Sequence, residues 1–115
     1  MTKKGHTIPL PGTPVRGSDT GRSIMAALDL LGRRWTLRIL WELQAGPQGF
    51  RQLQKSCDNM SPSVLDRRLK ELRTAKILEQ TPDTMWQIAP LGQELAEKLQ
   101  PLNEWSKVWQ SQLSK

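Results

Sequence analysis

Residues 61–72 have the sequence SPSVLDRRLKEL, and this stretch predicts the fold more strongly than any other part of the chain. Ser61 is a residue type that caps helix N-termini, and Pro62 suits the first helical position, where no backbone N–H is needed. Three leucines follow at a spacing of i, i+4 and i+7, which places them on one face: Leu65, Leu69 and Leu72. We therefore predict a helix from residue 61 to about 75 with this face buried.

Three shorter helices are predicted before it. The first begins near Ser23, a candidate N-cap, and stops at Gly32; the second covers about 35–44 and the third about 50–57. The first two carry apolar stripes at helical spacing, formed by Ile24, Ala27, Leu28 and Leu31 and by Thr36, Leu37, Leu40 and Leu43. In the third helix, the side chains expected to point inward are Phe50, Leu53 and Cys57.

Two short apolar runs, at 77–81 and 85–88, flank a turn of Pro82, Asp83 and Thr84, which predicts a small β-hairpin. The chain is then expected to be helical from 90 to about 113. The fold class is therefore mainly α with a small β-hairpin. Two short helices joined by a tight turn and followed by a two-stranded wing are the plan of a winged helix-turn-helix.

Composition limits the function. The chain of 115 residues is long enough for one domain, and its net charge of +6 with a pI near 10.0 favours a polyanionic partner. All of this excess lies in residues 1–57, where nine basic residues stand against three acidic ones. One cysteine and one histidine exclude a disulfide or a multi-ligand zinc site within one chain, and no cofactor is predicted. No apolar run approaches the roughly 20 residues of a membrane-spanning helix, so we expect a cytoplasmic protein without a membrane partner.

Residues 1–21 are rich in proline and glycine and lack apolar periodicity, which predicts a flexible N-terminal arm ahead of one domain at 22–115. The basic residues in and just after this arm resemble in kind the arms that enter a DNA minor groove: Lys3, Lys4, Arg16 and Arg22. A simple disordered tail is the favoured interpretation.

Four segments resemble the HxlR family of bacterial winged-helix transcriptional regulators, a relative of the MarR group. They are residues 27–36 (ALDLLGRRWT), residues 49–53 (GFRQL), residues 61–72, and the Leu91-Gly92 pair at the start of the last helix. Their order and spacing carry the resemblance, which extends from about residue 23 to 113. It implies a homodimeric DNA-binding repressor or activator whose recognition helix runs from 61 to about 74.

The geometry of the predicted recognition helix agrees with this resemblance. With its leucines inward, the opposite side displays Ser63, Asp66, Arg67, Lys70 and Thr74. Arg67 suits a bidentate contact to guanine and Lys70 suits phosphate, while Ser61 and Ser63 are placed to reach phosphate or base edges. Further candidate DNA contacts are Arg51, Gln52 and Lys55 on the preceding helix and, from the resemblance, Arg33 and Arg34. For any single arginine a merely solvated helix face explains the pattern equally well, and Arg68, beside the buried stripe, is expected to pair within the protein.

The chain departs from the family pattern in three places. Its wing, residues 79–86, is short and contains two acidic residues and no basic one, which would repel phosphate. Arg22 stands where many members of the family have a cysteine, several of which act as thiol sensors. The only thiol here is Cys57, for which we favour a structural role over redox sensing. Ala89 replaces the threonine that commonly caps the last helix, although Pro90 partly compensates.

The apolar stripe of the last helix is longer than one small domain can cover, and its charges cancel, which favours a dimer formed by the first and last helices. The residues expected at this interface are Ile24, Leu28, Leu95, Leu99, Leu102, Trp105 and Trp109. The predicted function is a homodimeric, sequence-specific regulator of a pseudo-palindromic operator in double-stranded DNA. The alternative is a winged-helix module that binds another protein. An enzyme is not expected, because the chain has no phosphate loop, nucleophile elbow or paired acids.

Overall fold

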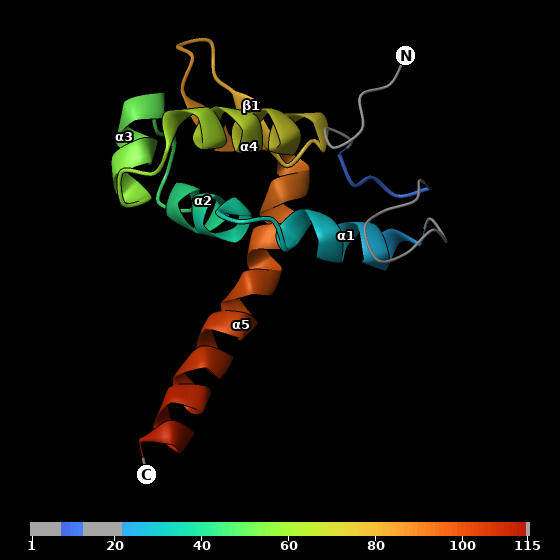
Figure 1. Ribbon diagram of the computed structural model, residues 1–115, viewed down its shortest axis with the longest axis vertical. Helices are drawn as coiled ribbons and strands as arrows, with labels where there is room; N and C mark the ends of the chain where they lie inside the picture. The colour runs from blue at the N-terminus through green and yellow to red at the C-terminus, as the bar shows by residue number, and fades with distance from the viewer. Residues whose placement is uncertain (1–7, 13–21, 115) are drawn as a thin grey trace.

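The computed structural model of the protein describes residues 8–12 and 22–114 (Figure 1). Its elements are α1 (Ser23–Leu31), α2 (Thr36–Leu43), α3 (Phe50–Ser56), α4 (Pro62–Thr74), β1 (Leu78–Gln80), β2 (Trp86–Ile88) and α5 (Pro90–Leu113). The predicted order of four helices, a hairpin and a long helix is confirmed. The first four helices and the hairpin form one body, and α5 leads away from it as a long rod (Figure 1).

Helix α4 forms as its sequence predicts. The Ser61 side chain accepts a hydrogen bond from the Val64 backbone N–H at 3.4 Å, and Pro62 is the first helical residue. Leu65, Leu69 and Leu72 are each at most 1% exposed and lie in the main hydrophobic core. One face of α4 is therefore fixed against the body, which determines which face is left for a partner.

The stripes of α1 and α2 are only partly buried, which corrects the sequence-based interpretation. In α1 the buried residues are Ala26 and Leu30, while Ile24 and Leu28 are more than half exposed; in α2 Ile39 is buried and Leu37 is exposed. Both helices carry apolar residues on more than one face, so periodicity alone could not show which face meets the core. The ends also differ slightly. Arg22, not Ser23, occupies the N-cap of α1.

The turn that joins α3 to α4 is held by hydrogen bonds. Asp58 and Asn59 have φ angles of 59° and 55°, a left-handed conformation that Asp and Asn tolerate better than most residues. The Asn59 N–H donates to the Gln54 carbonyl at 2.9 Å, and the Gln54 side chain donates to the Met60 carbonyl at 2.9 Å. The helix-turn-helix is therefore closed by its own polar groups.

The hairpin pairs antiparallel, with Leu78 opposite Ile88 and Gln80 opposite Trp86. Trp86 is 6% exposed and belongs to the hydrophobic core. The segment between α2 and α3 adds a feature that the sequence did not predict: Gln48 forms an isolated β-bridge with Trp86, through backbone bonds of 3.0 and 2.8 Å. The wing is thus attached to the segment between α2 and α3.

Helix α5 continues through Pro101. None of the described helices is long and apolar enough to cross a membrane.

Part of the predicted N-terminal arm lies on the body. The structure places 8–12 with Pro9 buried and Ile8 packed against the core. Pro9 lines an apolar hollow together with Ala26, Ala27 and Leu30 of α1, a neighbourhood that no periodicity indicated. The flexible arm over 1–21 stays a prediction. The basic residues Lys3, Lys4 and Arg16 lie outside the described residues.

Candidate nucleic-acid interface

The outer face of α4 displays the residues that the sequence predicted. Ser63, Asp66, Arg67, Lys70 and Thr74 are all exposed. Lys70 pairs with Asp66 at 2.9 Å, a solvent-exposed pair that is weak and easily exchanged for a phosphate contact. Within the described residues, Arg67 forms no ion pair. Its guanidinium is therefore available to a ligand on this face.

The N-terminal end of α4 lies beside α3 (Figure 1). There the Ser61 and Ser63 hydroxyls are 3.0 Å apart, and Ser61 also caps the helix. Arg51, Gln52 and Lys55 of α3 are all exposed. Backbone N–H groups at a helix N-terminus and nearby cations are a common setting for a phosphate group. The structure thus places these five predicted contacts on the two helices of the helix-turn-helix.

Arg33 lies in a different setting from the one that the resemblance suggested. Trp35 adopts a left-handed φ of 78°, so α2 begins at Thr36 and the turn before it directs Arg33 toward α4. There the Arg33 Nη1 is 2.6 Å from Oε2 of Glu71, a residue that is 7% exposed. Arg33 therefore links the turn before α2 to α4 through its ion pair with Glu71.

Arg68 also pairs with Glu71. Its position beside the leucine stripe predicted such a pairing within the protein. Its Nη1 is 3.1 Å from Glu71 Oε1, and its Nε donates to the Arg34 carbonyl at 2.8 Å. The Arg34 side chain itself is exposed and lies over the Trp35 ring, with Cζ 5.7 Å from the ring centroid. Of the two arginines in this turn, Arg34 is the more exposed, and both stay predicted DNA contacts.

The network predicts the effect of Glu71→Gln. This change keeps the side-chain volume but leaves two partly buried guanidiniums without their shared carboxylate, so we expect a loss of about 1–3 kcal/mol of unfolding free energy. Urea denaturation measures it. The matched control is Glu79→Gln on β1, where the carboxylate accepts only from the neutral Gln87 side chain and the expected change is below about 0.5 kcal/mol. Equal stability of the two variants would contradict the network's role.

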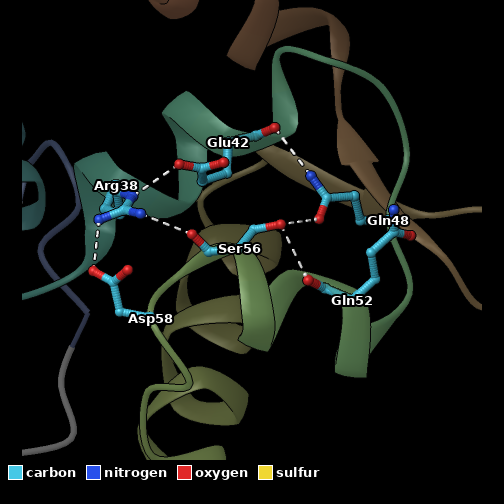
Figure 2. A network of polar contacts seen from close by, with 6 residues as sticks. All are labelled: Arg38, Glu42, Gln48, Gln52, Ser56 and Asp58. Atoms are coloured by element: carbon cyan, nitrogen blue, oxygen red, sulfur yellow. Dashed lines mark hydrogen bonds and ion pairs between the residues drawn. The ribbon is translucent and has the colours of Figure 1, made fainter.

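A second polar network supports the turn of the helix-turn-helix, and the sequence reasoning missed it (Figure 2). Arg38 of α2 pairs with Glu42 at 2.9 Å and with Asp58 at 3.1 Å, and its Nη2 donates to the Ser56 carbonyl at 2.8 Å. These contacts raise the pKa of Arg38, chiefly through the bond to Glu42 and then that to Asp58. Arg38 therefore holds the last turn of α3. The i, i+4 spacing of Arg38 and Glu42 was the only signal in the sequence.

Gln48 connects this network to the wing. Its side chain donates to the Glu42 carbonyl at 3.1 Å and accepts from the Ser56 hydroxyl at 2.9 Å (Figure 2). Its backbone forms the β-bridge to Trp86. One buried glutamine thus joins α2, α3 and β2. No periodicity marks such a residue, because its role depends on three elements that are distant in sequence.

Cys57 is fully buried, with 0% exposure, at the C-cap of α3. Burial is the largest cause of a raised thiol pKa, with Arg38 acting in the opposite direction. A protonated, buried thiol is a poor nucleophile, so the geometry supports the structural role that the sequence favoured.

This setting predicts slow modification of Cys57 in the native state. Ellman's reagent at pH 7.5 should react at least about 100-fold more slowly with the folded chain than with the urea-unfolded chain. Because the folded thiol holds its proton more tightly than the unfolded thiol, its contribution to stability is complete at neutral pH and is lost as the pH rises above about 8.5. Rapid stoichiometric modification of the native protein would instead favour redox sensing.

The wing presents no cation between residues 79 and 86. Glu79 accepts from the Gln87 side chain at 2.8 Å, and Asp83 is exposed at the turn. Arg73 of α4 donates to Gln80 at 3.2 Å and lies 5.6 Å from the Trp86 ring centroid. Arg73 therefore fastens the wing to α4.

The chain matches the HxlR-like helix-turn-helix family model over residues 30–114. It is 30% identical over 89 residues to the uncharacterized HTH-type transcriptional regulator YvaP of Bacillus subtilis strain 168, which covers 72% of this chain and 82% of YvaP. The crystal structure of quinone-bound YodB from B. subtilis is 28% identical, with a TM-score of 0.68 over 73% of this chain and 94% of YodB. A MarR-family structure from Enterococcus faecalis V583, 22% identical with a TM-score of 0.70 over 87% of this chain and 96% of that one, shares the winged-helix fold. The chain belongs to the HxlR-like helix-turn-helix family of transcriptional regulators.

Proposed function

We propose that the protein is a cytoplasmic homodimer that binds a pseudo-palindromic operator in double-stranded DNA, with α4 as the recognition helix. The observation that carries this proposal is the division of α4 into two faces. One face is locked into the core by leucines, and the other presents Ser63, Arg67 and Lys70 to solvent. A helix that is held rigidly on one side and bears short polar and basic side chains on the other is suited to the major groove.

The dimer is supported by apolar side chains that one chain leaves uncovered. On α5 Leu102, Trp105 and Trp109 are each at least half exposed, as are Ile24 and Leu28 on α1. Monomeric proteins rarely expose this many large apolar residues along one helix, and a second copy is the partner whose surface matches by symmetry. Leu95 and Leu99 are half-buried against the chain's own core, so we place the interface mainly beyond residue 99. Two copies would present their α4 helices to successive major grooves about 34 Å apart.

Arg67→Ala tests base readout. We expect a loss of about 10- to 100-fold in operator affinity with relaxed preference at one base pair, because a bidentate arginine contact contributes about 1–3 kcal/mol of discrimination. Lys70→Ala should weaken binding to all sequences similarly and reduce the salt slope by about one. The measurement is fluorescence anisotropy on an operator identified by genome-wide mapping of bound sites. The control is Lys107→Ala, which removes an exposed charge of α5, and equal affinities for Arg67→Ala and this control would contradict the assignment of α4.

The alternative function is a module that binds another protein through the acidic wing. The exposed Asp83 and the absence of basic residues from 79 to 86 favour it. A titration of mixed duplex DNA at low salt separates the two functions. A DNA-binding dimer with twice the +6 charge of one chain should bind with a steep salt dependence, whereas no binding would favour the protein-interaction module.

A further inference from the structure

A polar hollow of about 650 Å³ lies between the α1–α2 turn and α4. Its volume falls within the range of small-molecule sites, about 300–1,000 Å³, but its lining is far more polar than is usual for them. The charged residues in this lining are Asp29, Arg33, Arg34, Arg67, Arg68 and Glu71. The wall of the hollow therefore carries four arginines against two acidic residues.

The charged side chains of the hollow differ in burial and in pairing. Glu71 is 7% exposed and lies 2.6 Å from Arg33 and 3.1 Å from Arg68. Arg34 and Arg67 are exposed, and neither forms an ion pair with a carboxylate of the described residues. These two guanidiniums come from different elements and are the arginines of the lining that no carboxylate pairs with.

We propose that this hollow binds a small molecule bearing a carboxylate or phosphate group, which Arg34 and Arg67 hold from opposite walls. Guanidinium groups are the side chains best suited to such oxyanions, because they donate two parallel hydrogen bonds. A phosphate of duplex DNA can reach the exposed arginines from outside, whereas the hollow of about 650 Å³ beside them has room for a whole small molecule. The volume of the hollow therefore favours a free small molecule over the DNA backbone as its occupant.

Because of where the hollow lies, a bound molecule would affect DNA binding, an inference that rests on the proposed function. Arg67 is also the proposed base contact, so an anion that holds it would compete with operator DNA. Leu28 of α1 lines the same hollow and is exposed to the proposed dimer partner. A ligand here would contact the dimer helix and the recognition helix together, and by linkage DNA would weaken the ligand's binding by the same factor.

The test uses the full chain and two probes, sodium pyrophosphate and sodium citrate, titrated by isothermal calorimetry at constant ionic strength in chloride buffer. We expect at least one probe to bind saturably with one site per chain. The double variant Arg34→Gln, Arg67→Gln should weaken this binding at least about tenfold. Both residues are exposed, and Arg68 donates to the Arg34 backbone carbonyl rather than to its side chain, so the variant should keep its fold, as a thermal melt checks.

The matched control is Lys98→Gln, Lys107→Gln, which removes the same charge from exposed positions of α5 and should retain the affinity within about twofold. The proposal is overturned if neither probe binds saturably up to about 10 mM. It is also overturned if the lysine control loses as much affinity for the probe as the arginine variant does. Loss of DNA affinity in the arginine variant without binding of either probe also overturns it, since the arginines would then serve only the DNA backbone. The calorimetry contains no DNA, so binding of a probe without binding of DNA would refute the proposed function and leave this site standing.

Discussion

Replacement of Gly92 by alanine is expected to destabilise the fold by at least about 3 kcal/mol, although only one methyl group is added. A Cβ at this position would overlap the Ile77 carbonyl oxygen and lie 2.8 Å from Cγ2 of Ile88. The Ile77 carbonyl cannot withdraw easily, because it accepts the Ala89 N–H at 2.9 Å as the hairpin enters α5. The methyl group must therefore separate the first turn of α5 from the hairpin.

Urea denaturation with circular dichroism measures this effect, and a fall of about 10 °C or more in the melting temperature should accompany it. The matched control is Gly49→Ala. Gly49 has a φ of −73° and an added Cβ would meet no atom within 4 Å, so only the mild preference of helix N-caps for glycine over alanine is lost. A Gly92→Ala variant as stable as the Gly49→Ala control would show that α5 does not approach the hairpin this closely.

Gly92 also illustrates how far the sequence predicts this fold. The Leu91-Gly92 pair is one of the segments that resemble the family, but nothing in the sequence gives the reason for the glycine. That reason is a close approach between α5 and a backbone carbonyl fifteen residues earlier. Helix α4, by contrast, is almost fully predicted, because its cap, its first-turn proline and its leucine spacing are all local signals that agree with one another.

The candidate site shows the same division. The exposed face of α4 follows directly from the leucine spacing, so Ser63, Arg67 and Lys70 could be placed without a structure. Arg33 could not, because its orientation depends on the left-handed Trp35 and on a carboxylate 38 residues away. Polar side chains that connect distant elements leave no periodic pattern. For this reason the Arg38 and Glu71 networks became visible only in three dimensions.

Disruption of the proposed dimer is expected to affect DNA binding more than any other change considered. Trp105→Glu is expected to convert a dimer into a monomer and to lower operator affinity at least about 100-fold, since a monomer contacts one half-site only. Trp105 is 56% exposed and stacks on Trp109, with ring centroids 5.7 Å apart. The C-terminal half of α5 projects from the body (Figure 1). A carboxylate at the centre of an apolar interface must be desolvated without a partner, at a cost of several kcal/mol.

Sedimentation velocity at micromolar concentration measures the oligomeric state, and anisotropy with whole and half operators measures the affinity. The Trp105 side chain is largely exposed in one chain, so its loss should leave the fold of the monomer intact, and this separates a dimer defect from unfolding. Ser111→Glu is the matched control, because it adds the same charge at an exposed position on the other side of α5, where the apolar stripe is absent. If Trp105→Glu remains a dimer with unchanged affinity, α5 is not the interface. If it becomes a monomer that still binds the whole operator as tightly as the wild type, recognition does not require two copies of α4.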